Sequence, residues 1–576
     1  MPMSNVQLRS IPDDGGSQWE PLPRDGIKDT IDSVVVAFVL AFVFRAFLVE
    51  AFIIPTGSMA PTLYGAHATI VCEDCGTEFA YGLKDSSQST GSGDVKPTHK
   101  AICPNCNHPN TQLETNDRKR NHENGDRILV FKWPFSFGSS RPDANRWDVV
   151  VFKNPANGSQ NYIKRLVGMP GEVLMIVDGD VYTVSADQLS PKMLDKLDQY
   201  RHEKYALRNG LGGRKMQPLP KPIHDELIEK MTIVRKTPLA QEALWFNVYD
   251  NDSPPKTPDS GQPAWKAAML GESGWDTSGR RVTFENKRVA EDYITLTGEP
   301  LRSRNAYNID TNIRGRRLLS PPPVSDLRVR FVLTPRTDSG TLHIRLEKNK
   351  RVFWATLGMN GDVAITESLK PPLTSSSSML SATVAPLAID RPIEVAFEHV
   401  DYRVALHVGG KEILATSTNS GSKAYYVPDV AKLLARRAKY TDAARPRIYA
   451  SGGDLDLTHL VVERDVYYIS PHPSDRPTWT AGRCWGTEDN PIFLRSWEYF
   501  MLGDNSAASQ DSRLWVTVGP HLTDRGEDYQ LGTVPADQLI GKAFFVYWPS
   551  GLRIPWLPPL DRIGIVPDVG RMRWIR

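Results

Sequence analysis

The stretch PTGSMAPTL, residues 55–63, is the most informative part of this 576-residue sequence. A serine that acts as a nucleophile needs an exposed position, a neighbouring base and donors for the oxyanion that forms. Gly57 allows close approach of the backbone, and a proline on each side restricts the flanking chain. Ser58 is therefore a candidate nucleophile, and the Thr56 hydroxyl could donate to the oxyanion. The alternative is a helix-to-strand turn in which Ser58 only caps the chain.

An apolar run lies directly before this motif. VVVAFVLAFVF occupies residues 34–44, and apolar character resumes after Arg45 and Glu50 as far as Ile54. As a helix, residues 34–54 would be roughly 31 Å long, close to the hydrocarbon thickness of a bilayer. We predict a transmembrane anchor over residues 31–54. The alternative is a cleavable signal peptide, but no small-x-small cleavage site closes the run.

Composition sets limits on the remaining chain. The formal net charge is +2, so no strong electrostatic field points to a nucleic-acid partner. Hydrophobic residues make up 40% and charged residues 24%, which is typical of globular domains and not of a multi-span membrane protein. A chain of this length is expected to divide into several domains.

Short apolar runs bounded by Pro, Gly or Asn predict β-strands from residue 126 onward, including DRILVF, DVVVF, YIKRLV and EVLMIV. Residues 186–245 have a polar, helical pattern, with IHDELIEKM as the clearest helix. Repeated alternating strands over about 180 residues then indicate a sandwich or jelly roll. Segments at 325–468 resemble concanavalin-like or laminin-G-like sandwiches in a general way. That resemblance identifies no ligand.

Four of the five cysteines form two Cys-x-x-Cys pairs, Cys72 with Cys75 and Cys103 with Cys106. CEDCG and CPNCN resemble zinc-ribbon knuckles, and a closed four-thiolate site is structural. The sequence therefore predicts a structural zinc and no cofactor for catalysis. Two disulfides are the first alternative, because the domain is expected outside the cytoplasm. The second alternative is that the cysteines form neither a zinc site nor disulfides. Cys484 is expected to be unpaired.

Four further segments follow the serine motif in the order and internal spacing of bacterial signal peptidase I, which this sequence resembles. They are GDRILV at 125–130, RWDVVVF at 146–152, YIKRLVGMPGE at 162–172 and GDNSAASQDSR at 503–513. The resemblance covers residues 31–71, 125–185 and 493–550. Family members usually have Arg and Asn where this chain has Ser506 and Ala508, which puts the packing of that loop in doubt.

The resemblance implies a role for each site residue. Ser58 would be the nucleophile and Lys164 its general base, with the Ser58 N–H and the Thr56 hydroxyl as the oxyanion hole. Ser509 would hold the lysine amine, and Asp511 and Arg513 would form a structural ion pair. A lysine acts as a base only when its neutral form is populated, which burial achieves. The alternative for Lys164 is a solvent-exposed lysine on a strand.

The expected architecture is mainly β: a signal-peptidase-type β core with an inserted β-sandwich and one N-terminal transmembrane helix. Residues 190–480 are expected to be peripheral to the chemistry, because every candidate catalytic residue lies outside them. The expected segments are a disordered tail (1–30), the anchor (31–54), three core parts (55–71, 125–185 and 493–550), a zinc-ribbon-like insert (72–110), a helical or irregular linker (186–285), the β-sandwich (286–468) and a C-terminal tail (551–576).

The function implied by the resemblance is that of a membrane-bound serine endopeptidase. It would cleave signal peptides from exported preproteins through an acyl-enzyme, in the cytoplasmic membrane, with the catalytic domain on the extracytoplasmic side. Expected partners are signal peptides, membrane lipid and an unknown ligand of the sandwich, with no nucleic acid. The alternatives are another Ser–Lys maturation peptidase, or a catalytically dead, membrane-tethered binding protein that uses the sandwich.

Overall fold

The computed structural model describes most of the chain between Gly26 and the C-terminus. Residues 1–25 of the predicted tail (1–30), the Ser/Gly-rich loop at 83–100 and most of the predicted C-terminal tail lie outside the described residues. The described ranges are 26–82, 101–110, 122–136, 144–208, 219–256, 261–268, 273–286, 292–303, 307, 322–371, 379–416, 426–435, 444–469, 484–488, 490–515, 517–549 and 568–576.

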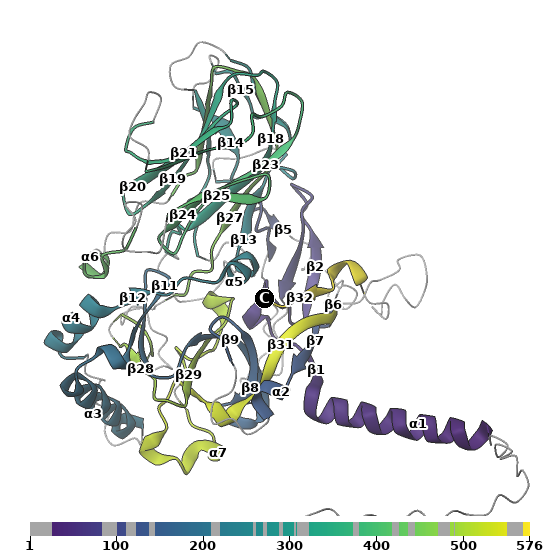
Figure 1. Ribbon diagram of the computed structural model, residues 1–576, viewed down its shortest axis with the longest axis vertical. Helices are drawn as coiled ribbons and strands as arrows, with labels where there is room; N and C mark the ends of the chain where they lie inside the picture. Colours follow the sequence, from purple (N-terminus) through teal and green to yellow (C-terminus); the bar gives the residue numbers. More distant parts are fainter. Residues whose placement is uncertain are drawn as a thin grey trace, which may run out of the picture.

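The N-terminal helix α1 (Gly26–Val43) projects from the body of the molecule (Figure 1). A π-helical turn (Phe44–Leu48) follows, and then strand β1 (Val49–Ile53). The predicted helix over 34–54 is therefore wrong in its last part, because β1 pairs with β7 (Arg127–Phe131) and tertiary pairing overrides the apolar run. The helix also starts inside the predicted tail. Within the described residues, no helix combines the length and the hydropathy needed to cross a membrane.

The catalytic core is built on one antiparallel sheet that joins three distant parts of the chain. The strand order is β1-β7-β31-β8-β9-β29-β30, and β32 (Arg573–Trp574) pairs with β31. The pairing of β9 with both β8 and β29 brings the second and third core segments together, as predicted. The remaining strands of this sheet are β8 (Val149–Asn154), β9 (Asn157–Gly168), β29 (Glu498–Leu502), β30 (Val534–Pro535) and β31 (Leu539–Trp548).

A smaller sheet and three helices extend this core. The sheet has the order β12-β11-β10-β28, with β10 (Glu172–Val177) central and fully buried. Its other strands are β11 (Asp180–Ser185), β12 (Thr232–Ile233) and β28 (Ile492–Phe493). The helices confirm the helical pattern after residue 186. They are α3 (Pro191–Arg208), α4 (Lys221–Lys230) and α5 (Pro238–Ala243).

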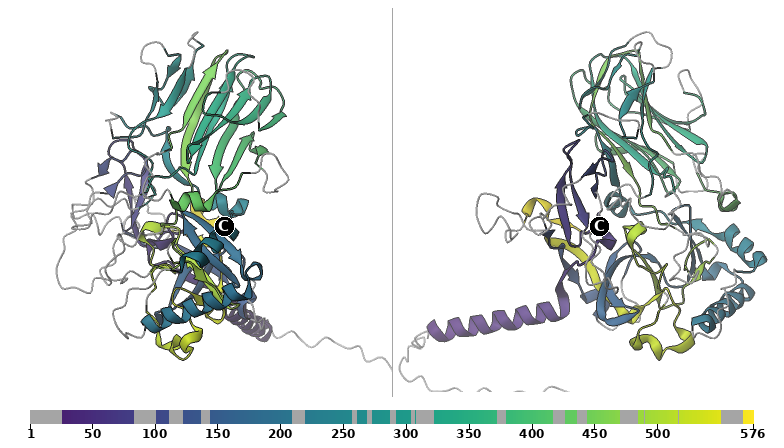
Figure 2. Two further views of the ribbon diagram at one scale, coloured as in Figure 1. Left: turned by 90° about the vertical axis from the view of Figure 1, so that its left-hand side faces the viewer. Right: turned by 180° about the vertical axis from the view of Figure 1, so that it is seen from behind.

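The insert is a β-sandwich seated on one end of the core (Figures 1 and 2). Strands β13 to β16, between residues 246 and 284, belong to its two sheets, so the sandwich begins well before the predicted residue 286. These strands are two to five residues long, too short to show a period of two. One sheet has the strands β15 (Trp275–Asp276), β16 (Val282–Phe284), β27 (Leu455–Arg464), β18 (Leu327–Pro335), β23 (Ile393–Val400), β24 (Arg403–Val408) and β25 (Lys411–Ala415), with β13 (Phe246–Asp250) on β27. The other has β14 (Trp265–Ala267), β17 (Tyr293–Leu296), β26 (Arg447–Ser451), β19 (Thr341–Lys348), β20 (Arg351–Gly358), β21 (Asp362–Glu367) and β22 (Leu380–Thr383).

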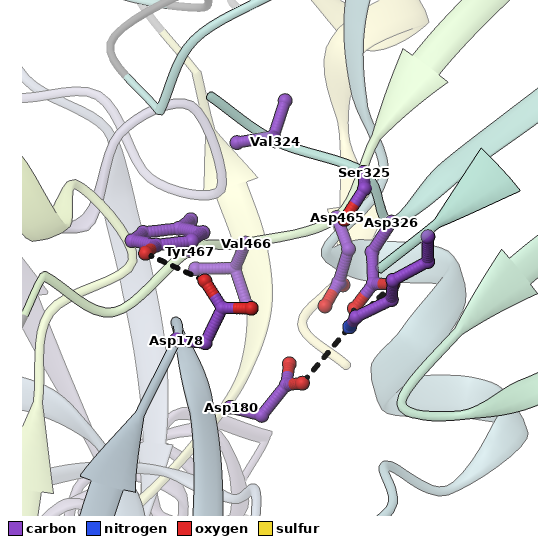
Figure 3. A pocket seen from close by; sticks show the side chains of 9 residues that line it. Asp178, Asp180, Val324, Ser325, Asp326, Asp465, Val466 and Tyr467 are labelled. Atoms are coloured by element: carbon purple, nitrogen blue, oxygen red, sulfur yellow. Dashed lines mark hydrogen bonds and ion pairs between the residues drawn. The ribbon is translucent and has the colours of Figure 1, made fainter. Parts of the chain in front are cut away.

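Buried ion pairs fasten the sandwich to the core. The Lys348 ammonium, at the end of β19, donates to Asp326 at 2.8 Å and to Asp180 of core strand β11 at 3.0 Å. Figure 3 shows Asp180 and Asp326 facing each other across this junction. The Lys236 ammonium forms two further ion pairs, with Asp401 at 2.8 Å and with Asp465 at 2.7 Å. Because buried charges are costly without partners, this network fixes how the two parts sit on each other.

Replacing Lys348 with methionine should destabilise this junction by about 3–5 kcal/mol, because it leaves buried carboxylates without a counter-charge. The loss should be larger at pH 8 than at pH 5, since burial already raises the pKa of Asp180 and protonation relieves the unpaired charge. Urea unfolding followed by tryptophan fluorescence measures the change. Lys221→Met, which removes an exposed pair with Asp225, is the matched control and should leave the midpoint unchanged. Equal midpoints for both variants would contradict this account.

Candidate active site

The candidate nucleophile lies on a short 3₁₀ turn, Gly57–Met59, just after β1. Met59 and Leu63 are fully buried and hold the loop in a core cluster with Ile128 and Val546, whereas Ser58 itself is only half-buried. The position that caps the turn is Thr56, and its side chain makes no capping hydrogen bond. The alternative in which Ser58 serves only as a cap is therefore wrong.

Lys164 lies opposite this loop, in the middle of the core sheet. It is on β9, in register with Val150 of β8, and its side chain is buried. Its amine donates to the Ser58 hydroxyl oxygen at 2.6 Å and to the Ile163 carbonyl at 3.0 Å. The alternative of a solvent-exposed strand lysine is wrong, because the serine and the lysine, 106 residues apart, are in direct contact.

The surroundings of Lys164 make its amine a usable base. Burial lowers the pKa of Lys164 to about 8, although the carboxylates of Asp511 and Asp504 act in the opposite direction. A substantial neutral fraction is therefore present at mildly alkaline pH. In that form the amine can accept a proton from the Ser58 hydroxyl, and the 2.6 Å contact needs no rearrangement for the transfer.

Asp511 and Arg513 form the predicted ion pair. The Arg513 guanidinium donates to both carboxylate oxygens, at 2.7 and 2.9 Å, and both side chains are buried. Ser506, one of the two departures from the family pattern, accepts hydrogen bonds from Arg513 and from the Ile469 backbone, each at 2.8 Å. The loop is thus tightly packed around serine at this position, which removes the doubt about its packing there.

Ser509 lies in the site, but not in the predicted contact. Its side chain is buried and its hydroxyl has no hydrogen-bond partner among the described residues, Lys164 included. A Cβ on Gly503 would lie 2.1 Å from this hydroxyl and 2.5 Å from the Ser58 carbonyl oxygen, so glycine is required for the close packing. Thr56 is exposed beside the serine. The roles of Ser509 and Thr56 stay predictions.

Two residues that tie the nucleophile loop in place were not identified from the sequence. Asp504 accepts both guanidinium hydrogen bonds of Arg165, at 2.7 and 2.8 Å, and one from the Thr62 hydroxyl at 2.6 Å. Asn505 donates from its side chain to the Gly57 carbonyl at 3.0 Å and from its backbone to the Ser58 carbonyl at 3.1 Å. The available signal was a second charged residue, Arg165, directly after Lys164 and before the apolar Leu166 and Val167 of the same strand.

A third unpredicted neighbour comes from the sandwich insert. The ring of Tyr307 lies against Gly57, such that a Cβ on that glycine would be 3.0 Å from the ring. The expectation that residues 190–480 are peripheral to the chemistry did not foresee this contact.

The four paired cysteines converge on one point. The Sγ atoms of Cys72 and Cys106 are 3.6 Å apart and those of Cys75 and Cys103 are 3.7 Å apart, and all four lie within 4.8 Å of one another. None of these pairs is bonded as a disulfide. A tetrahedral zinc with Zn–S bonds of about 2.3 Å would separate its sulfurs by about 3.8 Å, so this donor set fits the metal.

The local backbone has the shape that a knuckle needs. The chain turns back after each pair, with Gly76 N–H donating to the Cys72 carbonyl and Asn107 N–H donating to the Cys103 carbonyl. Gly76 and Asn107 have positive φ angles of 76° and 59°, which glycine and asparagine tolerate best. The pairs lie on two small hairpins, β2–β3 (His67–Val71 and Glu78–Gly82) and β4–β5 (Ala101–Ile102 and Pro109–Asn110).

Comparisons with known proteins agree with this geometry. The family model described as signal peptidase, peptidase S26, matches residues 107–221 and 470–548. These segments contain Lys164, Ser509, Asp511 and Arg513, and the insert separates them. Ser58 lies outside the match, and its assignment depends on its motif and on its contact with Lys164.

Curated relatives carry the name signal peptidase I. The chain is 29% identical over 135 residues to that of Buchnera aphidicola, covering 23% of this chain and 27% of the relative. It is 33% identical over 93 residues to that of Pseudomonas fluorescens, covering 14% and 32%. The chain thus spans about a third of the length of the curated relatives it matches.

Among solved structures, the carbohydrate binding module CBM66 from Bacillus subtilis aligns with 35% of this chain and 95% of its own, at 7% identity. The TM-score is 0.22, too low to support an argument about fold or ligand. Two segments of this chain thus match the family model of signal peptidase, peptidase S26, and the chain is similar in sequence to proteins named signal peptidase I.

Proposed function

We propose that this chain is a serine endopeptidase that removes N-terminal signal peptides from exported preproteins, with Ser58 and Lys164 as its catalytic dyad. The observation that carries this proposal is the 2.6 Å contact between the Ser58 hydroxyl and the buried amine of Lys164. The match of two segments to the family model supports the reaction class, and the geometry supports the choice of residues. The dead-core alternative is disfavoured because the dyad is assembled.

The reaction proceeds through an acyl-enzyme. Neutral Lys164 removes the proton of the Ser58 hydroxyl as Oγ attacks the scissile carbonyl carbon. The Ser58 N–H and the Thr56 hydroxyl donate to the oxyanion. The resulting Lys164 ammonium then donates its proton to the leaving amine. Water, deprotonated by the same lysine, hydrolyses the ester and restores the free serine.

Asp504, Asn505 and the Asp511–Arg513 pair position this dyad. Asn505 fixes the two carbonyls that flank the nucleophile. Asp511 accepts a hydrogen bond from Gly503 N–H at 3.0 Å, and Gly503 in turn packs against the Ser58 carbonyl. We propose that Ser509, whose side chain is buried in the site, holds the lysine amine during proton transfer.

We further propose that α1 anchors the chain in the cytoplasmic membrane, with the catalytic domain on the extracytoplasmic side. The support is that apolar side chains are exposed all around the helix, among them Phe38, Leu40 and Phe42. A helix that is apolar on every face is stable when protein or lipid covers it. Residues 49–53 lead directly from this helix to Ser58, so the active site would lie close to the membrane surface.

The four cysteines are proposed to hold one structural zinc that organises the zinc-ribbon-like insert. With four thiolates the site is closed and supplies no water for catalysis. Asn105, which lies between Cys103 and Cys106, connects this insert to the sandwich. The Asn105 amide accepts from Asp250 N–H at 2.6 Å and donates to the Ser253 carbonyl at 2.7 Å. The insert therefore braces the start of the sandwich.

Ser58→Ala and Lys164→Met should each lower cleavage of a purified preprotein by about 10³-fold or more, because the dyad acts as a unit. Both variants should remain folded by circular dichroism. Lys153→Met, which removes an exposed lysine from neighbouring strand β8, is the matched control and should cleave normally. Mass spectrometry of the products reads the cut site. Near-normal cleavage by the Ser58→Ala protein would remove the basis of this proposal.

The pH dependence of kcat/KM should report Lys164. Because burial lowers the pKa of Lys164 to about 8 and only the neutral amine is a base, kcat/KM should rise roughly tenfold per pH unit below pH 8 and level off above it. Initial rates between pH 6 and pH 10 measure this profile. A profile that is flat from about pH 7 to pH 9 would indicate a different base.

The purified protein should contain one zinc per chain, as measured by elemental mass spectrometry. Cys75→Ser should lose the metal and lower the thermal unfolding midpoint, because zinc binding and folding are linked. Cys484→Ser is the control and should retain the zinc, since Cys484 lies outside the cluster. Two disulfides in a metal-free protein would show that the cysteines have the other predicted role.

A further inference from the structure

The sandwich insert contributes one side chain to the surroundings of the nucleophile. Tyr307 follows β17 in the chain, yet its ring lies against the catalytic loop. A Cβ built on Gly57 would be 3.0 Å from the Tyr307 Cε1 atom and 3.1 Å from its hydroxyl oxygen. The hydroxyl end of the phenol therefore packs against the residue directly before Ser58, and a side chain at position 57 would require Tyr307 to shift by a few tenths of an ångström.

The ring of Tyr307 is held on its other side by the same catalytic loop. Its centroid is 5.6 Å from that of Tyr64, with the two rings tilted by 50°. Tyr64 is in turn tied to the core through its backbone N–H, which donates to Asp126 at 3.0 Å. Tyr307 thus packs between the two ends of the loop that presents Ser58.

The Tyr307 hydroxyl has no hydrogen-bond partner among the described residues, although the side chain is only 7% exposed. Burial, and then the proximity of Tyr64, Tyr81 and Asp126, raises the pKa of Tyr307, so the hydroxyl keeps its proton and can donate. A buried hydroxyl without a partner is unfavourable, because it has lost its hydrogen bonds to water. Since buried tyrosine hydroxyls usually have a partner, this one calls for an explanation.

We propose that Tyr307 is a substrate-binding residue whose hydroxyl, covered in the free protein, becomes accessible when a peptide binds beside Ser58 and donates a hydrogen bond to a backbone carbonyl of that substrate. The inserted sandwich then completes the active site of the core and is more than an accessory domain. This inference rests on the proposed peptidase function. The acceptor for the Tyr307 hydroxyl is a backbone carbonyl oxygen of an extended peptide. Such an acceptor is present whatever side chains the peptide has.

The way the sandwich is attached supports this role. A hydrogen bond to substrate is useful only if its donor is held within a few tenths of an ångström. Two buried lysines, Lys348 and Lys236, bridge the sandwich and the strands next to the core, and Asn105 fixes the start of the sandwich. These contacts are stiffer than a flexible linker would be. They therefore hold the sandwich in a fixed position relative to the core, as a domain that supplies a substrate contact requires.

Tyr307→Phe in the full-length protein tests this inference, because it keeps the ring and removes only the hydroxyl. The KM for a preprotein should rise about five- to tenfold with kcat within about twofold, as expected for the loss of one uniform binding hydrogen bond. The thermal unfolding midpoint should be unchanged or higher, because an unsatisfied buried group is removed. Tyr426→Phe removes another buried, unpartnered hydroxyl of the insert and is the matched control, with unchanged kinetics expected.

The outcomes separate this inference from the proposed function. If wild-type protein cleaves the preprotein and Tyr307→Phe has the same KM, the inference is overturned while the peptidase function stands. A lower unfolding midpoint with unchanged KM would assign the hydroxyl a structural hydrogen bond and also overturn it. If wild type and Ser58→Ala are equally inactive, the proposed function fails, and this inference fails with it.

Discussion

The lysine amine at the centre of this protein is kept out of water, 2.6 Å from a serine hydroxyl, and the surrounding core maintains that arrangement. Lys164 is placed in the interior by a strand that pairs on both sides, with β8 and with β29. Burial favours the neutral amine, and two nearby carboxylates oppose it. Those carboxylates, Asp504 and Asp511, are each held in a bidentate pair with an arginine, which limits their effect on the lysine.

The division of the core into three sequence segments has a structural consequence. Because β13 and β27, the first and last strands of the insert, pair with each other, with Phe246 opposite Arg464, the chain enters and leaves the insert at neighbouring points. A whole domain can then be inserted at little cost, since the entropy of loop closure grows slowly with length. Here the inserted sandwich is also locked by buried charges, and it places Tyr307 beside the nucleophile loop.

Much of the site could be predicted from local sequence. The serine motif and the two Cys-x-x-Cys pairs each have a local chemical pattern, whereas the roles of Lys164, Asp511 and Arg513 were implied by resemblance to a family. The contact between Ser58 and Lys164 was inferred only through resemblance to a family, because no local pattern links residues so far apart. The strands of the core and the longer strands of the sandwich were visible through their alternation.

What could not be predicted depends on tertiary contacts. The predicted anchor helix was too long at its end, because apolar residues such as Val49 and Phe52 are compatible with either a helix or a strand. Only the pairing with β7 shows that they form a strand. The short strands before residue 286 have too few residues to show a period. Tyr307 was missed because a single tyrosine outside any periodic pattern gives no signal of where it lies in the fold.

The most direct test of the account is the titration of the Lys164 amine itself. Carbon-13 NMR of the lysine Cε, assigned by comparison with the Lys164→Met protein, reports the pKa without any substrate. This one resonance should titrate near pH 8, because burial lowers the pKa of Lys164 to about 8. A Lys164 resonance that titrates together with the exposed lysines would show that the amine is charged at working pH, and would contradict its role as the base.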